Sequence, residues 1–403
     1  MSEYPLEPLG NICEINPDTL TEASDPTRRY RYIDLSSIKE QKADLSITPL
    51  PFAVLPSRAR RRVAFNDVLL GTVRPNLKNF AIIESEDNDL LCSTGFAVLR
   101  SKKNISDPRF IFHVINSEIA TRQLNALVTG SNYPAVNATQ VAELLIPVPP
   151  LPEQKKIAEI LSGIDNMLHL TLQQLSRITK LRQRISRSYF EGDQFRQHQS
   201  HEFTMGELAH GRHGIVDGPF GSNLKTEHYK ESGIPVIQSG FVTSGKFVAE
   251  NYKYVDQAKY EEQIRSSVSG GDLVMAKIGT NAGRSALIPF GHPTGILAGN
   301  CLKITPNENL ITKEYLAELM NYYYFSGRLA DITNTTAQPA VSMSQLKKLS
   351  AFIPAIADQK KICSSLHSLD AVASYWEDKH LKIILIKKAL CSDLLSGRKR
   401  VTI

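Results

Sequence analysis

The stretch PPLPEQKKIAEILSGID, Pro149–Asp165, returns as PAIADQKKICSSLHSLD, Pro354–Asp370. Each copy follows an apolar segment that stops at proline, and each opens a long run in which apolar residues are spaced by three and four. A proline at the start followed by charged residues and then an apolar stripe is typical of a helix N-terminus. The sequence therefore predicts two long helices that start in the same way.

The repeat extends well beyond these two stretches. A period of 205 residues, measured between Gln154 and Gln359, is far above the roughly 20–50 residues of solenoid repeats, so it predicts a duplicated domain. The parts before Asp67 and before Asp272 align poorly, which indicates two halves that share a frame and differ in their early segments. In the same register, and without a gap, Asp67-Val68-Leu69 falls on Asp272-Leu273-Val274, Pro134-Ala135-Val136 on Pro339-Ala340-Val341, and Gly192 on Gly397.

Each half has a strand-rich region punctuated by glycine and proline, a shorter helical segment (109–127 and 314–332), a last strand and a long helix. A helix of ~38 residues is ~57 Å long, longer than a small domain is wide, so we expect the two helices to pair. Short connections on both sides make the pair antiparallel. The predicted seam positions are Ile157, Leu161, Ile164, Leu168, Leu172, Leu175, Ile178, Leu181, Ile185 and Tyr189, then Ile362, Leu366, Leu369, Ala373, Trp376, His380, Ile383, Ile386, Leu390 and Leu394.

The predicted fold class is α+β, a pseudo-two-fold tandem duplication in which two long antiparallel helices separate two domains with β-rich cores. The predicted boundaries are 1–149 for the first domain, 150–192 for the first long helix, 193–353 for the second domain, 354–397 for the second long helix, and 398–403 for a basic tail.

The composition is that of an ordinary globular protein, with 42% hydrophobic and 22% charged residues among 403. There is no apolar run of about 18 residues and no leader-like N-terminus, so we expect a cytoplasmic protein without a membrane span. The five cysteines form no CxxC pair, which favours reduced thiols over a disulfide framework or a zinc site. A formal charge of +6 permits a polyanionic partner without demanding one.

Motifs of self-contained catalysis are missing from the sequence. HExxH, GxSxG, GxGxxG and Cys/His metal spacing do not occur, and there is no glycine-rich turn of the kind that holds S-adenosylmethionine. A loose arrangement of Asp18, Glu40 and Lys42 leaves open a stand-alone metal-dependent nuclease as a minor alternative. The sequence favours a binding protein over an enzyme.

The twin helix starts resemble one family. A proline-led Glu/Asp-Gln-Lys-Lys-Ile that opens a long helix, present twice after two dissimilar domains, resembles the specificity subunit of type I restriction–modification enzymes. PLPEQKKIAEIL (150–161) and ADQKKI (357–362) carry the resemblance, together with GDLVMAKIGTNAGRSALI (271–288) and DGPFGSNLKTEHYKESGIPVI (217–237). The second copy departs from the pattern at Ile356-Ala357, where Leu-Pro or Leu-Ala is usual.

This resemblance implies a non-catalytic subunit for host defence and DNA methylation. Its two target recognition domains would each read half of a bipartite, asymmetric double-stranded DNA sequence. The long helices would hold two methyltransferase (modification) subunits, and restriction or motor subunits would complete the complex. S-adenosylmethionine, ATP and magnesium would bind to those partners and not to this chain. The alternative of another class is a coiled-coil scaffold that never contacts DNA.

Candidate contact residues follow from the chemistry of DNA, because phosphates attract Lys and Arg while base edges suit Arg, Asn, Gln and Lys on loops. For phosphates we predict Arg58, Arg60, Arg61 and Arg62. For base edges in the first half we predict Arg74, Asn76, Lys78, Ser131, Asn132 and Tyr133. For the second half we predict Ser222, Asn223, Lys225, Lys277, Asn281, Arg284 and Gln338. For partner docking we predict Gln154, Lys155, Lys156, Gln359, Lys360 and Lys361.

Overall fold

Two four-stranded sheets form the body of the first half of the chain. In the computed structural model, which describes residues 3–128, 134–192, 201–219, 221–334 and 338–403, their orders are β6-β3-β10-β7 and β2-β11-β8-β9. Strands β3 and β10 run parallel, and the other pairs are antiparallel. The bounds are β2 Cys13–Ile15, β3 Arg29–Ile33, β6 Leu50–Pro51, β7 Ala59–Arg62, β8 Val68–Gly71, β9 Phe80–Ile82, β10 Leu90–Ser93 and β11 Phe96–Ser101.

The second half repeats this arrangement strand for strand. Its sheets have the orders β16-β15-β20-β17 and β14-β21-β18-β19, and again one pair, β15 with β20, is parallel. The bounds are β14 Ile215–Asp217, β15 Ile234–Ile237, β16 Lys253–Val255, β17 Ser267–Val268, β18 Leu273–Ala276, β19 Ser285–Leu287, β20 Gly295–Leu297 and β21 Cys301–Ile304.

The duplication predicted from the sequence is confirmed by these strands. From β8 and β18 onward, corresponding strands begin 205 residues apart, as the starts of β8 at Val68 and β18 at Leu273 show. The earlier strands also occupy corresponding places in the sheets, although their sequences do not align. The shared frame therefore includes the sheet strands of the early segments, in which the two sequences do not align.

A short strand pair closes each half. β1 (Leu6–Pro8) runs antiparallel to β12 (Leu145–Pro147), and β13 (His201–Thr204) runs antiparallel to β24 (Ser350–Ile353). The first residues of each half thus lie beside its last strand, just before the long helix. The remaining elements are α1 Leu9–Ile12, β4 Ile38–Lys39, β5 Lys42–Ala43, α2 Pro108–Asn116, α3 Glu118–Leu127, α4 Ala138–Ala142, α7 Met205–Leu208, α8 Gln257–Glu262, α9 Lys313–Phe325, β22 Thr333–Asn334, β23 Ala340–Val341 and α10 Met343–Lys348.

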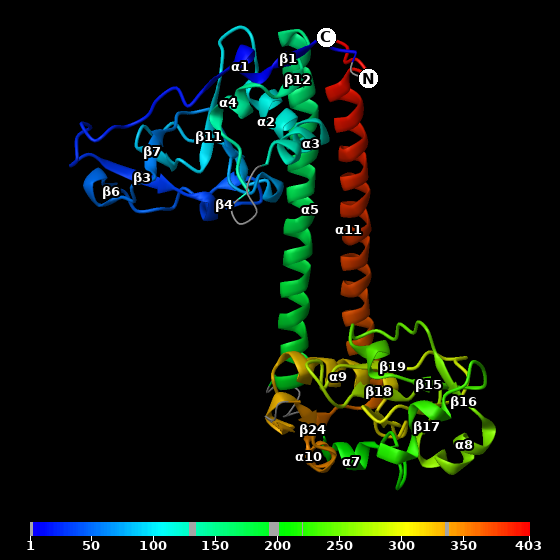
Figure 1. Cartoon of the computed structure of the whole chain (residues 1–403). Helices are drawn as coiled ribbons and strands as arrows, with labels where there is room; N and C mark the ends of the chain where they lie inside the picture. The colour runs from blue at the N-terminus through cyan, green and yellow to red at the C-terminus, as the bar shows by residue number, and fades with distance from the viewer. Residues whose placement is uncertain (1–2, 129–133, 193–200, 220, 335–337) are drawn as a thin grey trace. The chain divides into compact units, whose positions relative to one another are not determined.

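The long helices α5 (Leu151–Glu191) and α11 (Ile356–Ser396) have 41 residues each and are labelled in Figure 1. The chain forms two compact units, Met1–Gln174 with Trp376–Ile403, and Leu175–Tyr375, so each long helix contributes to both. In the first unit the start of α5 meets the end of α11, and in the second unit the end of α5 meets the start of α11. The predicted antiparallel pairing is confirmed within each unit.

A buried glutamine fixes the start of each long helix. Gln154 and Gln359 are both 0% exposed. Gln154 accepts a hydrogen bond from the Asp107 amide and donates to the carbonyls of Ile105 and Pro149. Gln359 makes the same three bonds, to the Thr312 amide and to the carbonyls of Leu310 and Pro354. We call these glutamines the latches, because each ties its helix to the loop that precedes α2 or α9.

An ion pair joins the two long helices in each unit. In the first unit Lys387 of α11 lies 2.5 Å from Asp165 of α5. In the second unit Arg182 of α5 lies 2.5 Å from Asp370 of α11 and also binds Glu318 of α9. Asp165 and Asp370 are 205 residues apart, and so are Arg182 and Lys387. The two ion pairs are therefore equivalent, with α5 giving the acid in the first unit and the base in the second.

The predicted seam is correct in part. His380 was predicted in the seam, and its ring lies 2.6 Å from the hydroxyl of the buried Thr171, which was not predicted there. Leu172, Leu181 and Ile386 were predicted to be buried in the seam, and this was wrong, because they are 43%, 46% and 52% exposed. Regular spacing alone does not distinguish the inner from the outer side of a long helix. All five cysteines are free thiols, as predicted.

Candidate nucleic-acid interface

Three of the four predicted arginines, Arg60, Arg61 and Arg62, lie on strand β7. The pairing of β7 with β10 shifts register here, so that Arg62 lies opposite Leu91, Arg61 opposite Cys92, and Arg60 has no partner residue on β10. Arg60 stacks over the ring of Phe52 at 5.0 Å, and Arg62 pairs with Asp18 at 3.2 Å.

The other members of the run differ in exposure. The Arg61 side chain is half-buried, its Nη1 is buried without a hydrogen-bond partner, and burial lowers its pKa. Arg58, just before the strand, is exposed. Arg58 is therefore the most accessible of the four cations.

The turn between β8 and β9 presents the first base-edge candidates. Arg74 and Lys78 flank a 3₁₀ turn, and both have a left-handed backbone, with φ of 47° and 51°. Arg74 and Asn76 are exposed. Lys78 instead donates from Nζ to the carbonyl of Asn116. The backbone of Arg74 donates to the carbonyl of Pro134, which brings this turn next to the segment that follows residues 129–133. The predicted residues Ser131, Asn132 and Tyr133 lie outside the described residues.

An equivalent pair of segments meets in the second half. Val73 bridges Ala135 in the first half, and Ile278 bridges Ala340 in the second. The turn between β18 and β19 thus lies beside the segment that contains Gln338. Asn281 and Gln338 are exposed, as expected of residues that contact a ligand. The second half thus places the turn that carries Asn281 beside the segment of Gln338, and the first half places the turn that carries Arg74 beside Pro134 and Ala135.

Two predicted cations of the second half are engaged within the unit. Lys277 pairs with the buried Asp217 at 2.9 Å. Arg284 donates to the carbonyl of Thr243 and lies within 5 Å of the ring centres of Tyr324 and Phe325. Both side chains therefore have partners within the unit: Lys277 neutralises Asp217, and Arg284 holds the loop that follows residue 242.

The remaining candidates of this half lie on a short irregular segment. Asn223 and Lys225 are exposed, and Lys225 lies 3.8 Å from Glu227. The side chain of Ser222 lies outside the described part of the structure. These positions remain predictions.

The docking prediction needs one correction. The side chains of the latches Gln154 and Gln359 are buried and donate to the backbone carbonyls of Pro149 and Pro354. They therefore do not face a partner subunit. Lys155, Lys360 and Lys361 are exposed, and Lys156 pairs with Glu159 one turn further along α5. The motif therefore combines a buried structural residue with lysines that remain docking candidates.

The metal-nuclease alternative finds no support in the described residues, where no cluster of three or more His, Cys, Asp and Glu is arranged to hold a metal ion. Asp18 is engaged by Arg62. Glu40 lies in the tight turn between β4 and β5, where it and Gln41 both have positive φ. Among the described residues, no helix is long and apolar enough to cross a membrane.

Sequence reasoning missed the charged clusters around the long helices. His113 of α2 is buried, lies 3.0 Å from Ser162 and 3.8 Å from Asp165, and its pKa is lowered to about 4 by burial. Its equivalent, Glu318, contacts Arg182 and His367. The pairs Asp165/Asp370 and Arg182/Lys387 are visible in the 205-residue register, so this register could have predicted which charges meet.

The fold and these loops define a class, a duplicated recognition protein in which two copies of one frame carry different surface residues. Comparison with known proteins gives the family. The chain matches the type I restriction modification DNA specificity domain over residues 63–180 and 219–382. It belongs to this family, so the predicted identity as a type I specificity subunit is confirmed.

Relatives of known name support this assignment. The chain is 24% identical over 320 residues to the specificity subunit of the type I restriction enzyme MjaVIII of Methanocaldococcus jannaschii, covering 77% of this chain and 75% of the relative. It is 22% identical to the putative MjaX specificity subunit of the same organism, covering 99% and 94%. The specificity subunit of EcoKI from Escherichia coli is 22% identical, covering 70% of this chain and 63% of the relative.

Solved structures share the fold. A chain from a type I R-M system, studied for its complex assembly and conformational transition, has a TM-score of 0.66 at 21% identity and covers 98% of both chains. The HsdS subunit from Thermoanaerobacter tengcongensis has a TM-score of 0.52 at 19% identity, covering 98% of this chain and 97% of its own. The S subunit from M. genitalium has a TM-score of 0.57 at 15% identity, covering 98% and 96%.

Proposed function

We propose that each half of this chain reads one part of a bipartite, asymmetric DNA target. The observation that carries the proposal is the pairing of one frame with two different sets of loop residues. The turn between β8 and β9 carries the exposed Arg74, whereas the position 205 residues further on is Gly279. Donors that differ at corresponding places would select different bases, so the two words of the target would differ.

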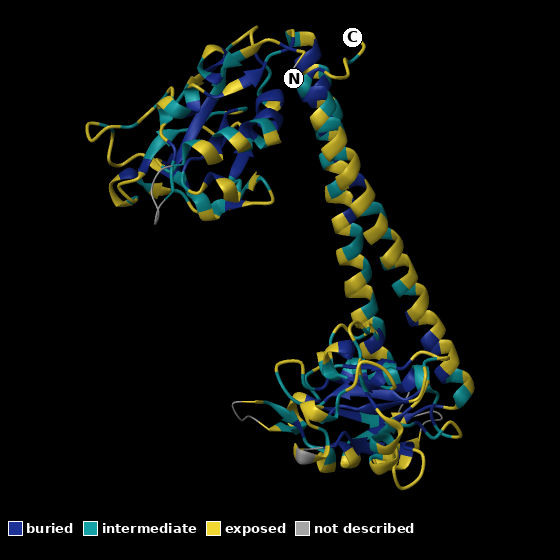
Figure 2. Cartoon of the chain, turned by 45° about the vertical axis from the view of Figure 1, so that its right-hand side comes forward, coloured by how far each residue is buried: buried dark blue, intermediate teal, exposed yellow. Residues whose placement is uncertain are grey.

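Partner subunits are proposed to dock on the long helices. Figure 2 shows exposed residues along much of α5 and α11. Large apolar side chains are exposed at matched positions, with Met167, Leu170 and Leu181 on α5 and Val372, Tyr375 and Ile386 on α11. Members of each pair lie 205 residues apart, so the two halves offer similar apolar positions. Two identical methyltransferase subunits would use such repeated surfaces.

The chemistry would then reside in the partners. In this proposal the chain binds no cofactor, the methyltransferases bind S-adenosylmethionine, and a restriction or motor subunit binds ATP and magnesium. The complex would act in the cytoplasm, where chromosomal and invading DNA are both accessible.

The spacing between the two words is proposed to depend on helix length. At 1.5 Å per residue, a 41-residue helix is about 61 Å long. At 3.4 Å per base pair this corresponds to roughly 18 base pairs, from which the width of the two words must be subtracted. We therefore propose two short words about one turn of the duplex apart.

Long-read methylome sequencing tests this function. Cells that express this chain with its methyltransferase should gain a methylated motif of two words and a fixed gap, and cells that lack only this chain should not. A stable complex of the two proteins without any new methylation would favour the scaffold alternative, because docking would then occur without DNA recognition.

A further inference from the structure

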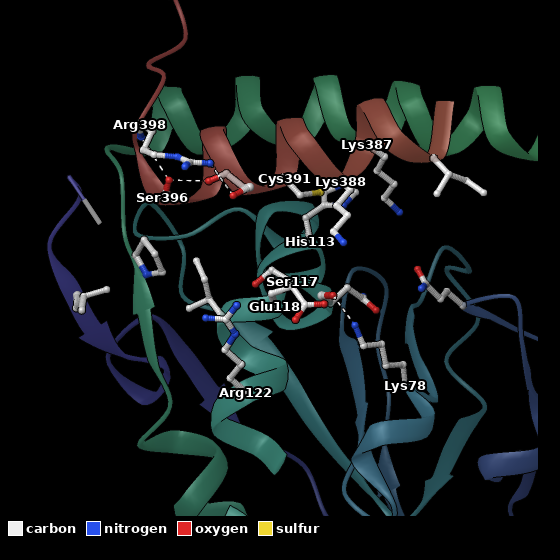
Figure 3. Close-up of a pocket in the computed structure, with 17 residues that line it drawn as sticks. Lys78, His113, Ser117, Glu118, Arg122, Lys387, Lys388, Cys391, Ser396 and Arg398 are labelled. Carbon is white, nitrogen blue, oxygen red and sulfur yellow. Dashed lines mark hydrogen bonds between the residues drawn. The ribbon is translucent and has the colours of Figure 1, made fainter. Parts of the chain in front are cut away.

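A cleft of about 690 Å³ lies in the first unit, between the end of α11 and the helices α2 and α3. Figure 3 shows Lys388 extending from α11 towards this space, with Lys78 and Arg122 on the other side. Its lining residues carry five cations and, in this described part of the chain, one acid, Glu118. The cations are Lys78, Arg122, Lys387, Lys388 and Arg398.

Two of the five cations are already neutralised. Lys387 pairs with Asp165 at 2.5 Å, and Arg398 pairs with Asp393 at 2.6 Å. His113 adds no charge at neutral pH, because burial lowers its pKa to about 4. Within the described residues, Lys78, Arg122 and Lys388 have no acidic side chain within 4.0 Å. Arg122 and Lys388 are also exposed, so their guanidinium and ammonium groups are available to a ligand.

The backbone adds a further positive contribution. Ser117 occupies the N-cap position of α3, but its hydroxyl donates to the carbonyl of Val114 and does not cap the helix. Ser117 and Glu118 line the cleft, so the N-terminus of α3 lies at its wall. The first amides of a helix and its dipole favour an anion at this end. Side chains and backbone therefore favour the same sign of ligand.

The second half does not repeat this feature. The positions 205 residues after Lys78 and Arg122 are Gly283 and Gly327, and the position 205 residues before Lys388 is Gln183. The positions that follow Ser117 and Glu118 in this register are Tyr322 and the buried Tyr323, and Tyr322 stacks on Phe190 at 5.2 Å. Aromatic side chains thus stand where the first half has a charged cleft. A partner that docks equally on both halves does not explain cations present at these positions in the first half and absent from the equivalent positions of the second, so we expect the ligand to prefer the first half.

We infer that this cleft is a phosphate-binding site, with Arg122, Lys388 and Lys78 as the cationic contacts. The phosphate could belong to the backbone of duplex DNA, and this source rests on the proposed function. It could also belong to a nucleotide polyphosphate, and this source does not. Glu118 opposes either ligand, and it sets an upper limit on affinity that a neutral residue would raise.

The test compares variants of the full chain with two probes, a short fluorescein-labelled duplex over a salt series and sodium tripolyphosphate by calorimetry. The test variant is Arg122→Gln with Lys388→Gln. The matched control, Lys103→Gln with Arg109→Gln, removes the same charge from exposed positions of the same unit outside the cleft. Arg122→Lys with Lys388→Arg keeps the charge and reports on folding.

If duplex phosphates fill the cleft, the test variant lowers the slope of log K against log salt by about two, at about 0.9 per phosphate contact, and the control leaves it unchanged. If a polyphosphate fills it, the test variant binds tripolyphosphate at least roughly tenfold more weakly, while Glu118→Gln binds it more tightly.

Equal behaviour of test variant and control with both probes overturns the inference. If the wild-type chain binds no duplex at all, the proposed function fails. The tripolyphosphate measurement then decides the cleft alone, and absence of binding there overturns it.

Discussion

The latch glutamines offer a sharp test of how the long helices are anchored. Gln154→Leu keeps the volume of the side chain and removes three hydrogen bonds, to the Asp107 amide at 3.0 Å and to the carbonyls of Ile105 and Pro149 at 3.1 and 2.9 Å. The bond to Pro149 is fully buried, and the other two are partly buried. At about 2 kcal/mol for the buried bond and about 1 kcal/mol for each of the others, the first unit should lose roughly 4 kcal/mol.

Hydrogen exchange resolves this loss residue by residue. In Gln154→Leu the Asp107 amide should exchange much faster, whereas the Thr312 amide, held by the intact second latch, should keep its protection. Urea unfolding followed through Trp376, the single tryptophan and a member of the first unit, should show the same loss. The exposed neighbour Lys155→Gln should change stability by no more than about 0.5 kcal/mol. Equal urea midpoints for the two variants, with a protected Asp107 amide in both, would refute the latch.

Three further predictions concern DNA, spacing and pH. Arg58→Ala should lower the salt slope of duplex binding by about one without changing the methylated motif, and a changed motif would show that Arg58 contacts bases. Insertion of four residues after both Gln174 and Tyr375 adds ~6 Å to each helix and should lengthen the spacer by about two base pairs, as methylome sequencing of the folded variant would show. His113 has a folded pKa of about 4, below its usual 6.5, so its neutral form stabilises the fold fully above pH ~6.5 and this contribution is lost as the pH falls through 4. Between these pH values the free energy of unfolding in urea should fall by roughly 2–3 kcal/mol more for the wild type than for His113→Gln. Parallel pH profiles of the two proteins would contradict the lowered pKa of His113.

Much of the architecture was predictable because it repeats. The 205-residue register located the long helices, the duplicated frame and the matched positions Ala135 and Ala340. The structure adds that each of these two residues bridges the preceding turn of its own half. The register could not reveal that the early strands of the two halves also correspond. A strand needs only a suitable pattern of buried and exposed residues, and many unrelated sequences have such a pattern. The register therefore predicts equivalent positions where the two sequences align, and it misses equivalent strands where they do not.

Individual side chains were harder to predict. Gln154 and Lys155 are neighbours in one motif, yet the first is buried and the second exposed, and only the loop before α2 decides this. Arg284 resembles a DNA-reading residue in sequence, but aromatic rings from α9 surround it in the fold. Such partners are distant along the chain, and local sequence does not encode them.

The exchanged ion pairs have a consequence for the ancestry of the chain. Each long helix carries an acid and, 17 residues later, a base: Asp165 and Arg182 on α5, and Asp370 and Lys387 on α11. In an antiparallel pair the acid of one helix meets the base of the other at both ends. A half-length chain with one such helix would therefore be complementary to a second copy of itself. Tandem duplication of one such half would keep both ion pairs within a single chain and leave the loops of each half free to differ.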